Sequence, residues 1–181
     1  MKRINLIKVF TTCLLMMFFY PAFGLANQVI KINRINNKGQ RVGLWVSSIQ
    51  YRTIEAYYKD GVESGVYRLL NHRDRLLVLG EYQNGKMYGT WFYFDEIGFL
   101  QMVFKDFSKN TTSIINGKNK KRYIPDYKCY SISYYSNGNI KNEGLLLWSE
   151  GETPESNFSI KHGEWKYYNE NGILICTEEF K

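Results

Sequence analysis

Residues 82–93 read YQNGKMYGTWFY, and this stretch decides the fold. The pair Asn84-Gly85 tolerates the positive φ angles that a tight turn between twisted antiparallel strands requires, and the same holds for Asp60-Gly61, Asn137-Gly138 and Asn171-Gly172. The run that follows Gly89, residues 90–94, is rich in aromatic side chains, which favour a strand. The stretch therefore predicts the turn of a β-hairpin followed by one of its strands.

The same pattern recurs along the chain with a period of about 23 residues. In most units the pattern starts with a Gly-x-x-x-Gly pair, and in the last unit a single glycine occupies the position of the second one. Two residues after this glycine comes a large aromatic side chain. The members of this frame are Gly43 with Trp45, Gly65 with Tyr67, Gly89 with Trp91, and Gly163 with Trp165. A fifth, shortened unit fits around Gly138 if Cys129 takes the glycine position. The repeat predicts an all-β fold in which each unit is one hairpin, stacked in chain order, with almost no helix beyond residue 30.

Two stretches interrupt the repeat, at about residues 107–126 and 149–157. They are predicted to be surface loops of opposite charge, the first basic and the second acidic. The basic loop holds a candidate binding surface for anionic lipid or polysaccharide, made of Lys118, Lys120, Lys121 and Arg122. Because Asn116-Gly117 echoes Asn84-Gly85, this loop is also a candidate for a decayed repeat unit.

The N-terminal residues 1–26 have the composition of a helical secretory signal peptide. A basic start precedes an apolar run from Val9 to Phe23, which is shorter than a membrane-spanning helix requires. Cleavage is predicted near Gly24 or Ala26, which makes residues 27–181 an exported domain of the periplasm or cell exterior; lipid modification at Cys13 is the less favoured alternative. Removal of the signal lowers the net charge from +7, because 21 basic side chains then remain against 17 acidic ones. No nucleic-acid partner is therefore expected.

Residues 82–93 resemble the Tyr-x-x-Gly-x-x-x-Gly-x-Trp-x-Tyr pattern of MORN repeats. Residues 161–172, KHGEWKYYNENG, are similar to the bacterial variant of this repeat found in the YwqK-family antitoxin proteins. The resemblance covers most of the chain from about Asn36 to Phe180. It implies an open, curved, single-layered meander sheet of stacked antiparallel hairpins, and it implies scaffolding, membrane-proximal binding or protein partnership more often than catalysis.

The aromatic side chains two residues after each repeat glycine fall on one face of the predicted sheet, because strand side chains alternate. This row, Trp45, Tyr67, Trp91 and Trp165, is interpreted as a hydrophobic spine in which each repeat covers its neighbour. The alternative is an aromatic platform for a glycan or lipid. The glycines are interpreted as conformational devices, because no helix follows them to cradle a phosphate.

No motif in the sequence supports catalysis or a cofactor. His72 and His162 lack the spacing of metal ligands, and neither Cys129 nor Cys176 lies in a nucleophile motif. In the repeat frame two strands separate the two cysteines, so both thiols are predicted to be unpaired. We therefore expect no enzyme, no cofactor and no metal.

The leading hypothesis for function is a non-enzymatic module that binds or scaffolds a protein partner through its open sheet face and charged loops. The alternatives are an envelope lipid or glycan binder, and an antitoxin or immunity-type inhibitor. The last strand, which ends at residues 178–181, is predicted to be an edge that pairs with another chain, including a second copy.

Overall fold

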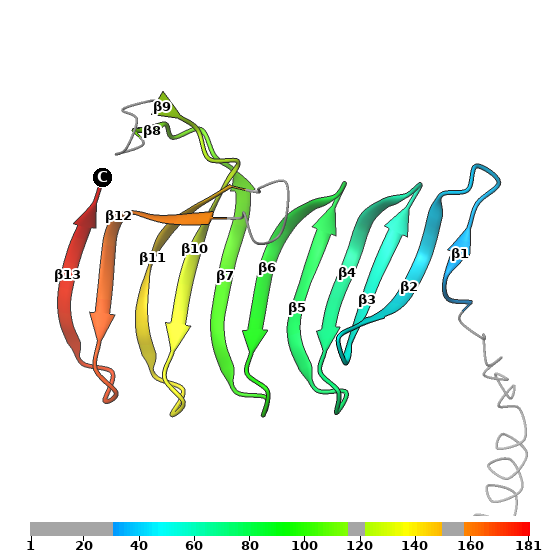
Figure 1. Ribbon diagram of the computed structural model, residues 1–181. Helices are drawn as coiled ribbons and strands as arrows, with labels where there is room; N and C mark the ends of the chain where they lie inside the picture. The colour runs from blue at the N-terminus through cyan, green and yellow to red at the C-terminus, as the bar shows by residue number, and fades with distance from the viewer. Residues whose placement is uncertain (1–30, 116–121, 150–157) are drawn as a thin grey trace, which may run out of the picture. The chain divides into compact units, whose positions relative to one another are not determined.

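The computed structural model describes residues 31–115, 122–149 and 158–181 (Figure 1). The predicted signal peptide and its cleavage site lie outside the described residues. So do Lys118, Lys120 and Lys121 of the basic loop, and the acidic loop from residue 150 to residue 157. The structure therefore tests the repeat domain, and leaves export and most of the basic surface as predictions.

The described chain is all-β, and it contains no helix. Eleven strands form one antiparallel sheet in the order β1-β2-β3-β4-β5-β6-β7-β10-β11-β12-β13, and two short strands pair separately as β8-β9. The strand bounds are β1 Arg34–Ile35, β2 Arg41–Ile49, β3 Arg52–Lys59, β4 Val62–Leu70, β5 Leu76–Gln83, β6 Lys86–Phe94, β7 Leu100–Lys109, β8 Ile114–Ile115, β9 Arg122–Tyr123, β10 Tyr127–Tyr134, β11 Ile140–Ser149, β12 Phe158–Tyr168 and β13 Leu174–Phe180.

The five predicted repeat units are five hairpins that follow one another across the sheet. They are β2-β3, β4-β5, β6-β7, β10-β11 and β12-β13. The predicted order is thus confirmed, including the shortened unit around Gly138. Figure 1 shows these strands side by side in a single layer, from β2 in blue to β13 in red.

Strands extend by one to three residues into both predicted interruptions. Residues 107–109 continue β7, where Ser108 and Lys109 pair with β10, and Ser149 is the last residue of β11, where it pairs with Phe158 of β12. The segment that remains between β7 and β10 carries the small β8-β9 hairpin. This hairpin lies outside the main sheet, so it is not a further unit of the stack (Figure 1).

The turns are of two kinds. Asp60-Gly61 and Asn84-Gly85, which join successive repeat hairpins, are two-residue turns in which both residues have positive φ, as the sequence predicts. Gln50-Tyr51, inside the first repeat hairpin, is a turn of the same kind. The turns inside the other four repeat hairpins are longer. There Gly98, Gly138 and Gly172 have positive φ, and Asp74 occupies the equivalent place with φ of 55°. Asn137 and Asn171 do not have positive φ, so those two Asn-Gly pairs mark the longer turn and not the tight one predicted.

The repeat glycines lie inside strands, not in the turns. Gly43, Gly65, Gly89 and Gly163 all have positive φ, a conformation that costs an L-residue about 1–2 kcal/mol. Next to Gly89 the register between β6 and β7 shifts before Trp91. These glycines are therefore bulge residues that bend the strand just before the aromatic side chain.

Two tryptophans lie flat over glycines of the neighbouring strand. A Cβ atom added at Gly80 would come within 2.2 Å of the Trp91 ring, and one added at Gly144 within 2.5 Å of the Trp165 ring. Neither glycine has positive φ, so the requirement for glycine is one of space. Trp91 and Trp165 are each only 2% exposed, and they anchor the hydrophobic core on this face.

Candidate functional site

The unit that begins at Cys129 breaks the aromatic pattern of the spine. Where other units place Trp91 or Trp165 two residues after the glycine position, this unit places Ser131. Two residues further on, where others place Tyr93 or Tyr167, it places a second serine, Ser133. Strand β10 therefore lacks two large side chains on the face where its neighbours carry them.

Cross-strand pairing puts these serines between large side chains. Along one row, Phe104 pairs with Ser131, Ser131 with Gly144, and Gly144 with Trp165. Along the next row, Met102 pairs with Ser133, and Ser133 with Asn142. Small and polar residues thus form a floor, and larger side chains from the flanking strands rise on either side.

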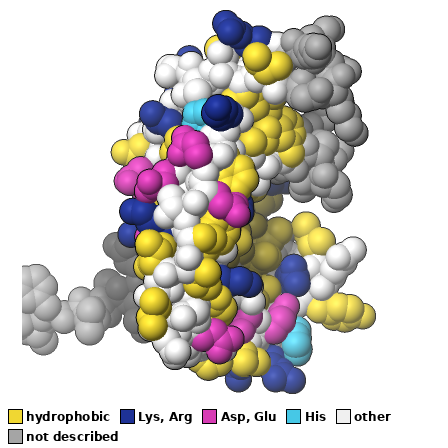
Figure 2. Space-filling model, turned by 90° about the vertical axis from the view of Figure 1, so that its left-hand side faces the viewer, with side chains coloured by type: hydrophobic (Ala, Val, Ile, Leu, Met, Phe, Trp, Pro, Cys, Tyr) yellow, Lys and Arg dark blue, Asp and Glu magenta, His cyan; other side chains and the backbone are white. Residues whose placement is uncertain are grey.

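The result is an open hollow of about 400 Å³ over the C-terminal half of the sheet. We call this space the hollow. It is lined by Tyr93, Met102, Phe104, Ser131, Ser133, Asn142, Leu146, Trp148, Ser159, Lys161 and Trp165. They come from five adjacent strands, β6, β7, β10, β11 and β12. Figure 2 looks from the β13 end of the sheet, and shows hydrophobic side chains gathered inside the hollowed face and charged ones along the outer face.

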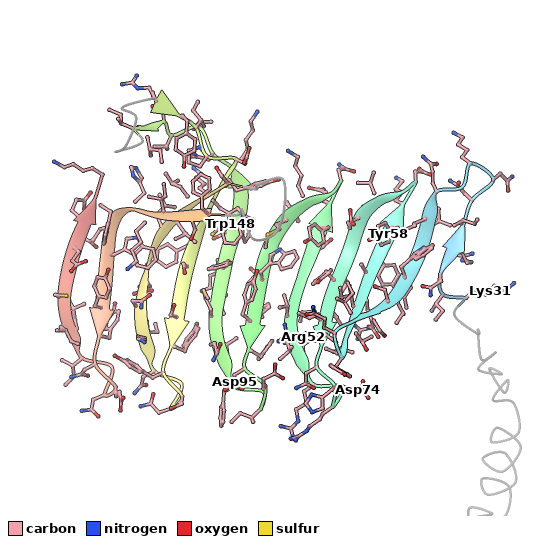
Figure 3. All side chains as sticks on the ribbon, viewed as in Figure 1. Lys31, Arg52, Tyr58, Asp74, Asp95 and Trp148 are labelled. Atoms are coloured by element: carbon pink, nitrogen blue, oxygen red, sulfur yellow. The ribbon has the colours of Figure 1, made fainter. Side chains whose placement is uncertain are left out.

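A bend in the sheet supplies the upper wall of the hollow. The register between β11 and β12 shifts between Gly144 and Leu145, and beyond this point β12 runs across the upper end of the sheet (Figure 1). The bent part of β11 carries Trp148, labelled in Figure 3, whose ring centre lies 6.0 Å from that of Phe104. A ring from the far end of β11 is thereby brought against the middle of β7.

One full charge lies on the described lining, that of Lys161. Its ammonium lies 4.6 Å from the centre of the Trp165 ring, 4.9 Å from that of Tyr167 and 5.3 Å from that of Phe180. It also donates a hydrogen bond of 2.8 Å to the hydroxyl of Tyr167. Ring faces attract a cation, so this arrangement holds the charge in place beside the hollow.

The indole of Trp148 offers a second donor. Its Nε1 atom is buried and has no hydrogen-bond partner within the described structure. The other three tryptophans each donate to a backbone carbonyl, namely Trp45 to Arg34, Trp91 to Tyr88, and Trp165 to Leu145. An unpaired buried donor costs about 1–3 kcal/mol, and among the four tryptophans Trp148 alone bears this cost.

Burial keeps the Tyr93 hydroxyl and the Cys129 thiol neutral near the hollow. Desolvation raises the pKa of Tyr93, with smaller contributions from Cys129 and Tyr67. Burial also raises the pKa of the Cys129 thiol to about 12. Neither group is therefore prepared to act as a base or nucleophile near pH 7.

The predicted aromatic spine is real, but it is uneven. Tyr67, Trp91 and Trp165 belong to one hydrophobic cluster, as the spine interpretation predicts. Trp45 lies outside that cluster, half-buried, with its ring centre 6.2 Å from that of Tyr58. The spine interpretation therefore holds for the central and C-terminal units more than for the first.

The other predicted sites lie apart from the hollow. Arg122, the one described member of the basic surface, is an exposed residue of β9. Cys129 is on β10 and Cys176 on β13, with β11 and β12 between them, so the predicted separation is confirmed and both thiols are free. No group of three potential metal ligands occurs among the described residues.

The hollow itself was not predicted, although the sequence carries a signal for it. In the repeat frame Ser131 and Ser133 stand at aromatic positions, and this substitution is visible without a structure. Lys161 and Trp148 carry no such signal, because the bend of β11 and β12 brings them to the hollow.

Protein-family models, curated proteins and solved structures were compared with this chain, and none of them matches. In the described part of the chain, no helix is long and apolar enough to cross a membrane. The residues and their geometry are therefore the basis for the proposal below.

Proposed function

We propose that this protein is a non-enzymatic binding module that holds a protein partner by inserting one of the partner's aromatic side chains into the hollow. The supporting observation is the pair Ser131 and Ser133, which stand where other repeat units carry aromatic residues. The partner would supply the ring that the fourth hairpin lacks. A hollow of about 400 Å³ lies within the usual range for ligand sites, about 300–1,000 Å³.

The surroundings of the hollow suit an aromatic guest. Tyr93, Phe104 and Trp148 present rings that already contact one another edge to face, at 5.2 Å and 6.0 Å between ring centres. An added ring can join this arrangement at a gain of about 0.5–1.5 kcal/mol per pair beyond burial. Ser133, which is partly exposed, offers a hydrogen bond to a polar atom on the same guest.

The proposal keeps the MORN-like interpretation and the export of the protein. The chain-ordered hairpins with bulge glycines support the first, and the second rests on residues 1–26 alone. Binding of lipid or glycan through the basic surface is the alternative candidate, and Arg122, its one described residue, does not line the hollow.

Photo-crosslinking tests the proposal at a chosen place. Met102 lines the hollow and Met87 does not, so replacement of methionine by photo-methionine puts an isosteric probe at both. In cells that produce the protein, we expect crosslinks to a partner from the peptide that contains Met102, located by mass spectrometry. The variant Met102→Leu, which keeps Met87, should lose them.

The captured partner is then purified and its affinity measured directly. Filling the hollow with Ser133→Trp should weaken binding at least about tenfold, because the added ring occupies the guest's place. The matched change Tyr134→Trp, one residue on and directed to the other face, should leave affinity unchanged. Crosslinks from Met87 alone, or equal loss of affinity in both variants, would contradict the proposal.

A further inference from the structure

Two donors converge on the hollow from the bent part of the sheet. Lys161 has three N–H groups, of which one is used by the Tyr167 hydroxyl, and Trp148 has one that finds no described partner. Both residues line the hollow, together with the hydroxyls of Ser131 and Ser133. The hollow thus presents one ammonium group beside hydroxyl and amide groups that both donate and accept.

The described lining contains no carboxylate to balance Lys161. The described ion pairs join other residues, such as Arg68 with Glu55 and Lys166 with Glu164, both on the opposite face. Lys161 instead rests on the rings of Trp165, Tyr167 and Phe180. Rings fix the position of an ammonium without neutralising it, so its charge is still available to an anion.

Resting on the proposed function, we infer that the hollow selects an aromatic group that carries a carboxylate. The ring occupies the space above Ser133, and the carboxylate lies beside the Lys161 ammonium, close to the Trp148 ring. Two sources share this chemistry, the free C-terminus of a chain that ends in an aromatic residue and an acidic side chain next to an aromatic one. Charge-assisted hydrogen bonds of this kind are about twice as strong as neutral ones.

Small probes test this inference without the natural partner. N-acetyl-L-phenylalanine and N-acetyl-L-phenylalaninamide differ in charge and share the ring. Titrations followed by NMR of the backbone amides and the indole N–H signals should show the acid binding at least about tenfold more tightly than the amide. The Trp148 indole signal, assigned with Trp148→Phe, should move with the acid. The Trp45 signal should not, because its indole is bonded to Arg34 at the far end of the sheet.

Two lysine variants separate local from general charge effects. Lys161→Met keeps the aliphatic stem over the rings and should reduce the affinity of the acid to that of the amide. Lys166→Met makes the same change in net charge from the opposite face and should leave the preference intact. Thermal unfolding of both variants checks that they are folded.

A third probe separates the two sources of the carboxylate. N-acetyl-aspartyl-phenylalaninamide carries its carboxylate on the side chain beside the ring. Tighter binding of this probe than of N-acetyl-L-phenylalanine assigns the acidic side chain, and the reverse assigns the free C-terminus.

Each outcome bears on the inference in a definite way. Equal affinity for acid and amide overturns the selection of a carboxylate but leaves an aromatic guest in place. A preference that survives Lys161→Met, or is lost equally in Lys166→Met, overturns the assigned position of the anion. Absence of binding by all three probes overturns this inference, whereas the Met102 crosslink decides the proposed function by a separate measurement.

Discussion

The glycine beneath each buried tryptophan has less room for a side chain than any other described glycine. The Trp91 ring covers Gly80 so closely that a methyl group has no room, and Trp165 covers Gly144 in the same way. Since Trp91 also contacts Tyr67 and Tyr82, a shift of this ring would disturb its neighbours on the same face.

We predict that Gly80→Ala lowers the free energy of unfolding by about 1–3 kcal/mol, the usual effect of overpacking. Urea denaturation followed by tryptophan fluorescence measures this change. In the background Trp91→Leu the same alanine should cost much less, because the ring that it meets is gone. Equal costs in the two backgrounds would show that the Gly80 to Trp91 contact is not the cause.

The two described cysteines should differ sharply in reactivity. Cys129 is 1% exposed with a pKa raised to about 12, so about one thiol in ten thousand is ionised at pH 8, whereas Cys176 is exposed on β13. Alkylation of the folded protein followed by peptide mass spectrometry should label Cys176 within minutes and leave Cys129 unlabelled until denaturant is added. Comparable rates would show that β10 opens readily.

The same raised pKa predicts a loss of stability in alkali. The folded state keeps the Cys129 proton, whereas an unfolded chain releases it above about pH 9. The contribution to stability is therefore complete below pH 9 and falls as the pH rises from 9 towards 12. Urea denaturation at pH 7 and pH 10 should show a smaller decline for Cys129→Ala than for the unmodified protein. An unchanged decline would assign the effect to the buried tyrosines, such as Tyr93, whose pKa burial also raises.

At the scale of single elements, the longer turns are joined to one another. Asn71 accepts hydrogen bonds from the backbone of Arg73 and Arg75 inside its own turn, and its amide donates to the backbone and side chain of Glu96 in the next turn. Asn169 makes the same two bonds inside its own turn, to Asn171 and Ile173. The pair offers a matched comparison.

We predict that Asn71→Ala costs more stability than Asn169→Ala, by about 1–3 kcal/mol. The Asn71 side chain is buried and also bonds Glu96, and removal of such a group leaves its partners unsatisfied. Thermal unfolding of the two variants measures the difference. Equal costs would show that the bridge between turns adds nothing.

The sequence predicted these elements to different degrees. The turns at Asn84-Gly85 and Asp60-Gly61 were predicted correctly, because a two-residue hairpin turn depends on the types of its own two residues. The requirement for glycine at position 144 was not predicted, because the ring that fills the space comes from residue 165 on another strand. The bend at Gly144 and Leu145 was missed for the same reason, because a register shift belongs to a pair of strands and not to either one.

At the scale of the whole described sheet, burial is uneven from strand to strand. Most of the buried aromatic and aliphatic residues lie between β6 and β12, whereas β13 is exposed along nearly all its length and β2 has no buried residue. Because each strand is stabilised mainly by its neighbours, the outer strands have the least support.

We therefore predict a gradient of amide hydrogen exchange across the sheet. Protection should be greatest in β6, β7, β10 and β11, and it should decrease towards β2 on one side and β13 on the other. Exchange measured by mass spectrometry on the native protein would show this gradient. Uniform protection would mean that the sheet opens in one cooperative step.

The order of the hairpins was predictable because the same glycine and aromatic pattern recurs in successive units. The candidate site was only half predictable. Ser131 and Ser133 stand out against the repeat frame, but Lys161 and Trp148 reach the hollow through a change of strand direction that no local pattern encodes. The two serines that depart from the repeat therefore mark where the hollow lies, whereas its charged group and its upper wall come from the bend of β11 and β12.

The connection between β7 and β10 makes a detour into the β8-β9 hairpin, and yet β10 still pairs with β7. Growth of a connection therefore leaves the neighbours of every strand unchanged. A gene of this kind can gain or lose hairpin-sized segments by duplication and deletion, and can then diversify a single copy while its siblings keep the protein folded. The serine-bearing hairpin is what such a diverged copy would look like.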